Sequence, residues 1–578
     1  MRFAFIPLIP TLFVACSSSP GPADATGGNP SSGGMSASGS GPYSTGGNVS
    51  GGGSGATGNL AGASNGGSSG GATSTQGGTT SSTGGANSKG GTTSSTGGTI
   101  PGSGGAGQQA GGTSGGSVGG SSGGRSTGGA SSGGASATGG TNSGGASATG
   151  GTSSGGNTSS TGGTPPVTAG DLFVSPTGDD ANDGSMAKPY YSLSKAVARA
   201  QAGTTIYMRG GTFNYSATIA LAASGTAAAP IKVWAYASEK PVLDFTNQPY
   251  GGENRGLLLT GNYWHMLGLE IAHAGDNGVK VEGSHNKIER CVFHHNGDSG
   301  IQLGFGHETV NPNGELCSYN EIINCDSYMN FDFDSKGGDA DGFACKMHNG
   351  KGNVFRGCRS YHNADDGWDL YETDWPVEIS NCWAFHNGDQ TDFDAIYLAK
   401  MGVKMSSYSG NGNGFKLGGN GTGGNSQGTH VVRNCVSFDH KFRSKKGFDQ
   451  NSHQGGVLVV NSVSWGNGYN FMFEDEPNSG FKNEFVNNVS FLAGTSLGME
   501  FSASAVLRNN SWQLPVTADA TDFVDLSEAS ALAPRGADGS LPNNGFARLT
   551  ANSDLIDKGV AVDLPFNGSA PDLGAFEH

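Results

Sequence analysis

Four aspartates and one lysine recur at matching places in a repeated sequence pattern, and together they could bind a cation and move a proton. Four carboxylates this close would repel one another unless a cation held them, and an all-oxygen ligand set suits Ca²⁺. A neutral lysine beside them could act as a general base. The structural alternatives are a solvated acidic turn surface and a lysine that only forms a salt bridge. The residues are Asp341 in ADGFACK (340–346), Asp365, Asp366 and Asp369 in ADDGWDL (364–370), and Lys416 in NGFKLGGN (413–420).

The pattern that carries these residues predicts the fold. Each copy has a polar-flanked Cys, Ser or Asn, as in FRGCRS (355–360), followed by a Gly step such as DGWDLY (366–371). Successive copies are about 25 residues apart, and such a period with short strands indicates a solenoid. Because strands alternate their side chains and parallel crossovers are almost always right-handed, we predict an all-β, right-handed parallel β-helix.

In such a solenoid, equivalent positions on neighbouring coils lie about 4.8 Å apart. Asp341 and Asp366 both precede the Gly, whereas Asp369 and Lys416 both follow it by two residues. If residues 389–411 are a loop insertion, Lys416 falls on the coil directly after Asp369. We therefore expect Asp341 to stack on Asp366, and Asp369 on Lys416.

Two coils have long gaps between the Cys position and the Gly step, which places insertions at about 327–340 and 389–411. Loops on one face of a rigid solenoid commonly form the walls of a binding groove. We expect both insertions to be loops of that kind.

The first coil needs a cap, because an open solenoid end exposes its core. Residues 191–202 have helical periodicity with Ser192 or Ser194 as the N-cap, and we expect this short helix to cover the first coil. Strands are expected at 204–211, 231–236 and 241–245, with a terminal strand at 571–578.

Composition divides the chain into three parts. Residues 1–16 combine Arg2, an apolar run and a small residue before Cys16, which predicts a secretory signal with a lipobox-like end. A lipid on Cys16 would anchor an exported protein at the cell surface or outer membrane, and the alternative is an ordinary cleaved signal and a secreted protein. Residues 17–168 form a Gly/Ser/Thr-rich linker expected to be disordered. Residues 169–578 form the folded domain.

The net charge of −16 argues against nucleic acid and against direct docking on an acidic lipid surface. No later stretch is apolar enough to cross a membrane, so we expect membrane contact only through the lipid. We also expect the protein to be a monomer. An acidic substrate would need a metal or basic residues. Lys441, Arg443 and Lys446 could grip its carboxylates, although solubility is an equal alternative.

Five of the eight cysteines share one repeat position, and Ser462 and Asn488 take it in later coils. A shared inward column explains them better than disulfides. Because export permits disulfides, a pair of Cys291 with Cys317 stays open, as does the state of Cys345. The five are Cys291, Cys325, Cys358, Cys382 and Cys435.

ADGFACK, ADDGWDL and NGFKLGGN resemble the motifs of polysaccharide lyase family 9, the pectate lyases, and the resemblance covers most of residues 170–578. It implies a catalytic β-helix domain that cleaves polygalacturonate by β-elimination to 4,5-unsaturated oligogalacturonides. It implies Lys416 as the catalytic base. Because a lysine is normally charged at neutral pH, we expect nearby Ca²⁺ and outward neighbours to lower the pKa of Lys416, which predicts an alkaline optimum. The resemblance also implies Ca²⁺ as cofactor, bound by Asp341, Asp365, Asp366 and Asp369.

Three other functions remain open from the residues alone. A β-helix pectin hydrolase would need an acid and a base carboxylate at a set separation, but neither Lys416 nor Ca²⁺. A lyase or epimerase could act on another uronide, such as alginate. A non-catalytic polysaccharide-binding surface protein would not need Lys416.

Overall fold

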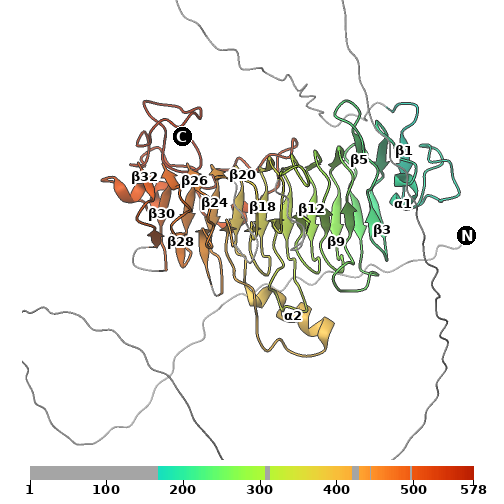
Figure 1. Ribbon diagram of the computed structural model, residues 1–578, viewed down its shortest axis with the longest axis horizontal. Coiled ribbons are helices and arrows are strands. Elements are labelled where there is room, and N and C mark those ends of the chain that lie inside the picture. Colours follow the sequence, from blue (N-terminus) through green and yellow to red (C-terminus); the bar gives the residue numbers. More distant parts are fainter. Residues whose placement is uncertain (1–166, 306–312, 420–427, 443, 495–497) are drawn as a thin grey trace, which may run out of the picture. The chain divides into compact units, whose positions relative to one another are not determined.

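The computed structural model describes residues 167–305, 313–419, 428–442, 444–494 and 498–578. These residues form three parallel β-sheets, and each complete coil contributes one strand to each sheet in turn (Figure 1). Strands of successive coils pair in parallel, so the predicted all-β parallel solenoid is confirmed. The charged turns and the insertions described below extend from this scaffold.

The sheets are named here in the order in which each coil visits them. The first sheet contains β1 (Leu172–Val174), β2 (Thr205–Met208), β5 (Ile231–Ala235), β8 (Trp264–Leu267), β11 (Lys287–Glu289), β14 (Glu321–Ile323), β17 (Asn353–Arg356), β20 (Val377–Ser380), β23 (His430–Arg433), β26 (Val457–Val460), β29 (Asn483–Val486) and β32 (Val506–Arg508). The second sheet contains β3 (Gly211–Asn214), β6 (Pro241–Asp244), β9 (Glu270–Ala272), β12 (Val292–His294), β15 (Asp326–Tyr328), β18 (Arg359–Tyr361), β21 (Trp383–Phe385), β24 (Val436–Phe438), β27 (Val463–Trp465) and β30 (Val489–Phe491). The third sheet contains β4 (Ile219–Ala220), β7 (Leu257–Leu259), β10 (Val279–Val281), β13 (Ile301–Leu303), β16 (Phe343–Cys345), β19 (Trp368–Asp369), β22 (Phe415–Lys416), β25 (Lys446–Asp449), β28 (Tyr469–Phe473) and β31 (Met499–Phe501).

The first coil is covered by a short helix, α1 (Leu193–Val197), as the sequence predicts. The Ser192 hydroxyl caps it by accepting from the Lys195 amide at 3.2 Å. The helix buries its apolar residues against the coil, but it is shorter than the predicted 191–202 segment. The other described helices are α2 (Gln390–Met401), α3 (Glu528–Ala531) and the 3₁₀ turns η1 (Ser511–Gln513) and η2 (Ala520–Asp522).

Aromatic rings stack through the core behind the third sheet. Phe343, Trp368, Phe415 and Phe448 lie on successive coils, with neighbouring ring centroids 4.7–4.9 Å apart. Each ring is fully buried, and offset stacks of this kind add to the stabilisation from burial. Because side chains alternate along a strand, this inward ladder holds the outward residues of the same strands in register.

The cysteine column lies at the turn between the first and second sheets. The residue before each cysteine has a positive φ, for example 55° at Asn324 and 66° at Gly357, which explains the recurrent Asn or Gly there. Side chains of the column accept backbone amides from the preceding coil: Cys325 donates its amide to Cys358 Sγ at 3.5 Å, and Cys435 donates its amide to Ser462 Oγ at 3.2 Å. Cys, Ser and Asn interchange because all three can accept.

The seven described cysteines are free and buried. The open alternative of a Cys291–Cys317 disulfide is therefore wrong for this structure, and Cys345 is also unpaired with any cysteine. The predicted inward column is confirmed.

The second insertion is not simply a loop. Residues 390–401 form helix α2, which Asp389 caps by accepting from the Thr391 amide at 2.9 Å and which ends at Gly402 with φ 71°. Phe393 of α2 stacks on Phe331 of the first insertion at 4.9 Å. The prediction of a pure loop at 389–411 is wrong because this packing between insertions stabilises a helix.

The C-terminal segment 571–578 has no strand, contrary to the expectation. It packs instead through buried Leu573 and Ala575, and Gly574 donates its amide to Asn487 O at 2.9 Å. Within the residues described, no helix has both the length and the apolar character needed to span a bilayer. The signal with Cys16 lies outside the described residues, as does nearly all of the linker, so those domain boundaries stay predictions.

Candidate metal and proton-transfer site

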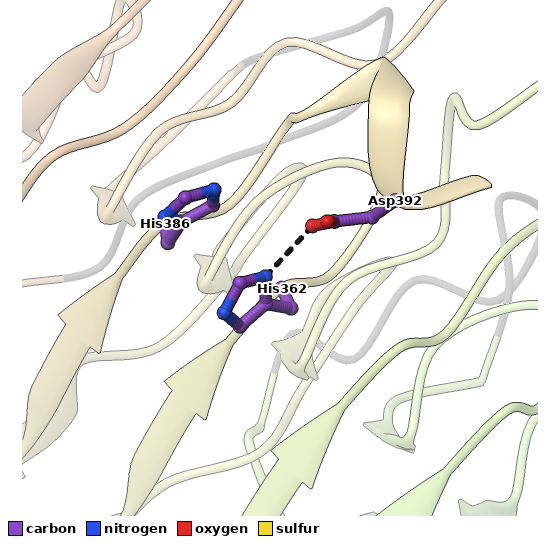
Figure 2. A group of neighbouring side chains, drawn as sticks. All are labelled: His362, His386 and Asp392. Carbon is purple, nitrogen blue, oxygen red and sulfur yellow. Dashed lines mark hydrogen bonds and ion pairs between the residues drawn. The ribbon is translucent and has the colours of Figure 1, made fainter. Parts of the chain in front are cut away.

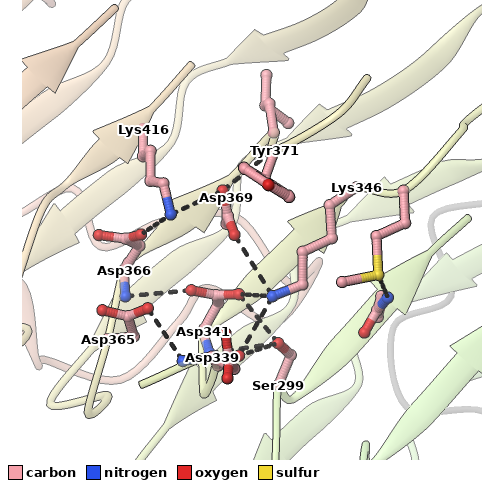
Figure 3. A network of polar contacts seen from close by, with 12 residues as sticks. Ser299, Asp339, Asp341, Lys346, Asp365, Asp366, Asp369, Tyr371 and Lys416 are labelled. Atoms are coloured by element: carbon pink, nitrogen blue, oxygen red, sulfur yellow. Dashed lines mark hydrogen bonds and ion pairs between the residues drawn. The ribbon is translucent and has the colours of Figure 1, made fainter. Parts of the chain in front are cut away.

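Strands β19 and β22 place Asp369 and Lys416 side by side, as the column alignment predicts. The two residues are direct partners in the parallel register, and Lys416 Nζ lies 3.3 Å from Asp369 Oδ1 (Figure 3). The preceding residue in each strand, Trp368 or Phe415, points into the core. The inward aromatic ladder therefore fixes the outward Asp–Lys pair.

Asp341, Asp365 and Asp366 lie in the turns that lead into β16 and β19. The Gly342 amide donates to Asp366 O at 2.9 Å, so the two turns are neighbours in the solenoid. One carboxylate oxygen from each of the three aspartates lies within 4.8 Å of the others. All three are buried, and Figure 3 shows them converging from adjacent coils.

The two insertions hold these carboxylates in place. The Asp339 amide, at the end of the first insertion, donates to Asp365 Oδ2 at 3.1 Å. The Asn413 side chain, just after the second insertion, donates to Asp366 Oδ1 at 2.8 Å, and the Asp366 amide donates to Asp341 Oδ1 at 3.2 Å. Each turn thus orients the carboxylate of its neighbour.

Lys416 is the predicted proton-transfer residue. Its Nζ lies 3.1 Å from Asp366 Oδ2, its side chain is 12 % exposed, and the Tyr371 ring centroid is 5.9 Å away. Burial alone would lower the pKa of Lys416, but the charges of Asp366, Asp369 and their neighbours raise it well above its ordinary value. The protein residues alone therefore do not lower the pKa of Lys416, and the expected lowering in the presence of Ca²⁺ stays a prediction.

A second lysine, Lys346, belongs to the cluster and was not singled out from the sequence. Its Nζ lies 2.7 Å from Asp341 Oδ2 and 3.4 Å from Asp369 Oδ2, and its side chain is only 4 % exposed. It is the last residue of ADGFACK, but it follows the strand, so alternation does not reveal its direction. Only the two acidic columns near Lys346 in the sequence could have indicated that a further lysine joins the cluster.

The donor set fits a divalent cation. Four carboxylates face two ammonium groups, Lys346 and Lys416, which leaves two negative charges when all are ionised. Burial raises the pKa of Asp366 to about 8, and that of Asp341 well above its usual range. Asp366 Oδ2 is buried, and the Lys416 ammonium lies 3.1 Å from it. Hard oxygen donors with this residual charge suit Ca²⁺.

The remaining predicted site residues are not drawn into this cluster. Lys446 Nζ pairs with Asp449 Oδ2 at 3.0 Å, and Lys441 pairs with Asp439. Arg443 lies outside the described residues. Asp449 follows Lys416 in the strand register, so Lys446 is on the next coil, and its role toward a substrate stays a prediction.

Comparison with known proteins gives a consistent assignment. Residues 172–488 match the family described as "Pel9A-like, right handed beta helix region". Pectate lyase L of Dickeya dadantii is 39 % identical over 414 residues, which is 70 % of this chain and 90 % of that protein. The crystal structure of pectate lyase Pel9A is 38 % identical, with a TM-score of 0.62 over 70 % of this chain and 96 % of that one. A structure titled rhamnogalacturonan lyase is 25 % identical, with a TM-score of 0.55 over 66 % of this chain and 97 % of that one.

Proposed function

The chain belongs to the Pel9A-like right-handed β-helix family of polysaccharide lyase family 9 and is a pectate lyase, and from this premise we propose a residue-level mechanism. Polygalacturonate is the substrate, Ca²⁺ is the cofactor and Lys416 is the catalytic base. The observation that carries the proposal is the position of Lys416 Nζ, 3.1 Å from Asp366 and 3.3 Å from Asp369, at the edge of a cluster of four carboxylates that two lysines only partly compensate when all are ionised.

The cation ligands are Asp341, Asp365, Asp366 and Asp369. Bound there, Ca²⁺ would offset the uronate carboxylate and make the adjacent C5 proton more acidic. The same carboxylates hold the pKa of Lys416 high, so their engagement by a cation would favour the neutral amine that a base requires.

In the proposed reaction, neutral Lys416 Nζ removes the C5 proton of a galacturonate unit. The electron pair left at C5 forms the C4–C5 double bond as the bond to O4 breaks, and O4 leaves with the preceding part of the chain and takes a proton from solvent water. Lys416 holds the abstracted proton as an ammonium, which Asp366 and Asp369 stabilise at 3.1 and 3.3 Å. A 4,5-unsaturated sugar end results.

The test is the identity of the product. The full chain is incubated with polygalacturonate, and the ultraviolet absorbance of the unsaturated end is followed with Ca²⁺ or with chelator. We expect a Ca²⁺-dependent rise. New reducing ends without that absorbance would establish hydrolysis and contradict the elimination.

A second candidate is elimination on another uronide-containing polymer. The rhamnogalacturonan lyase structure, at 25 % identity, supports it because it shows a related scaffold under a different substrate name. Parallel assays on polygalacturonate, rhamnogalacturonan and alginate separate the two, and faster elimination on either of the others would favour this candidate.

Export and lipid anchoring on Cys16 complete the proposal, with the β-helix acting as a monomer. The support is the signal-like segment 1–16 and the Gly/Ser-rich segment 17–168 that would act as a tether. We expect the full chain to partition into the membrane fraction of a lipoprotein-processing host and Cys16→Ser to lose that partition. Equal partition of both proteins would contradict the anchor.

A further inference from the structure

A second group of histidines and carboxylates lies at the turns that follow the second sheet. His362, His386 and Asp439 come directly after β18, β21 and β24, and each has a positive φ of 51–57°. Their turns are joined in series: the His362 amide donates to His386 O at 3.2 Å, and the His386 amide donates to Phe438 O at 3.2 Å. The two imidazole rings stack with centroids 4.3 Å apart.

Two segments outside the coils bring further carboxylates to these turns. Helix α2 and its cap contribute Asp392 and Asp389, and Figure 2 shows Asp392 reaching His362. Helix α3, far along the chain, contributes Glu528. Three parts of the chain therefore meet at the two histidines.

The contacts of His386 Nδ1 have the spacing of metal ligands. This atom lies 3.3 Å from Glu528 Oε2 and 3.4 Å from Asp439 Oδ2. It is buried, yet neither contact gives it a hydrogen-bond partner. Neighbouring donors around a tetrahedral Zn²⁺ with bonds of about 2.0–2.1 Å lie about 3.3 Å apart. One ligand atom from each of the three residues lies within 4.8 Å of the others.

The surrounding contacts would orient these three ligands. His386 Nε2 lies 3.3 Å from Asp389 Oδ2, the arrangement in which a carboxylate fixes the orientation of a metal-bound imidazole. His362 Nε2 lies 2.7 Å from the other oxygen of Glu528, and His362 Nδ1 lies 2.7 Å from Asp392 Oδ2. Because carboxylates only accept, both contacts use His362 N–H groups.

We propose that His386 Nδ1, Asp439 and Glu528 bind a first-row divalent metal ion of the Zn²⁺ type, at a site separate from the aspartate cluster. One imidazole nitrogen with two carboxylates suits Zn²⁺ better than Ca²⁺, which takes oxygen ligands. Three protein ligands leave one tetrahedral position for water. The ion fastens helix α3 to two coil turns, and through Asp389 it supports the start of α2.

The experiment uses the full chain, stripped with chelator and then saturated with Ca²⁺ so that the aspartate cluster is filled. Zn²⁺ alone is titrated by calorimetry, and thermal unfolding is followed at each ratio. We expect one saturable Zn²⁺ per chain and a rise in the unfolding midpoint. His386→Gln should weaken binding by about a hundredfold and abolish the rise, and Asp389→Asn should weaken it by about tenfold.

His265→Gln is the matched control. His265 also pairs with a carboxylate, Glu289 at 3.1 Å, and its side chain is 19 % exposed against 18 % for His386, but it belongs to no three-ligand group among the described residues. Glu528→Gln, a near-isosteric change on the half-exposed α3, repeats the test if His386→Gln fails to fold. No saturable Zn²⁺ binding, or binding of wild-type strength in both His386→Gln and Glu528→Gln, would overturn the proposal.

Discussion

At the scale of single residues, the aspartate cluster combines four buried carboxylates with two lysine ammonium groups. Lys346 is the less exposed of its two lysines, and it is sandwiched between Asp341 and Asp369 at 2.7 and 3.4 Å. Its ammonium compensates carboxylates that would otherwise face one another in a buried space. In the proposed Ca²⁺ site it would share with the cation the role of keeping those carboxylates together.

Replacing Lys346 by Met should make the stability of the cluster depend more strongly on bound Ca²⁺. The variant leaves three uncompensated negative charges instead of two, and loss of one partner of a buried ion pair costs about 3 kcal/mol of unfolding free energy. We expect Lys346→Met to unfold earlier than the wild type in chelator and to gain more from Ca²⁺. Thermal unfolding with and without Ca²⁺ measures this, and an unchanged Ca²⁺ shift would contradict the role.

The sequence placed the acidic column and Lys416 but not Lys346. Asp341, Asp366, Asp369 and Lys416 occupy fixed offsets from a repeated glycine, so a solenoid must bring them together. Lys346 comes after its strand has ended, where no periodicity fixes the direction of the side chain.

At the scale of elements, the side-chain column between the first two sheets links each coil to the next. Cys358 Sγ accepts the amide of Cys325, and Ser462 Oγ accepts that of Cys435. A side chain at this position therefore accepts the equivalent backbone amide of the preceding coil whether its acceptor atom is sulfur or oxygen.

This equivalence makes a pair of substitutions informative. Cys358→Ser should change stability little, because serine fills the same role at position 462. Cys358→Val should cost about 1–3 kcal/mol, since it leaves the buried Cys325 amide without an acceptor. Urea unfolding compares the two, and equal losses would show that packing volume, not the hydrogen bond, governs the column.

The elements that the sequence missed are those stabilised by distant packing. The solenoid strands follow from local repetition, but α2 depends on Phe393 stacking against Phe331 of another insertion. Nothing local to 390–401 distinguishes that outcome from a loop except the Asp389 cap and Gly402. The expected strand at 571–578 is absent because that segment packs through Leu573 and Ala575 against the side of the β-helix without pairing to a strand.

At the scale of the domain, a buried ionic cluster holds the segment around Arg535, which follows the last strand, to the β-helix. Asp326 of β15 accepts from Arg359 Nε and Nη2 at 2.8 Å each, and from Arg535 Nη2 at 2.7 Å. Burial alone would raise the pKa of Asp326, but the two guanidinium groups lower it below its ordinary value. The folded state therefore favours the ionised carboxylate.

A lowered folded-state pKa predicts the direction of the pH effect. The stabilisation from Asp326 is complete above its unfolded pKa of about 3.9 and is lost as pH falls toward the lowered folded value. Asp326→Asn should cost about 3–5 kcal/mol at neutral pH and should lose less stability than the wild type on acidification. Urea unfolding at neutral and acidic pH tests this, and parallel losses in both proteins would contradict it.

The most direct test of the central claim is the initial rate of unsaturated-product formation from polygalacturonate by Lys416→Ala, at saturating Ca²⁺ and mildly alkaline pH. Lys482→Ala is the control, because the Lys482 ammonium pairs with Glu484 at the surface and its side chain is 58 % exposed. We expect Lys416→Ala to lose about 10²–10⁴ in rate, the control to keep wild-type activity, and both proteins still to gain thermal stability from Ca²⁺. A Lys416→Ala rate within a few-fold of the control, with folding intact, would show that another group removes the proton.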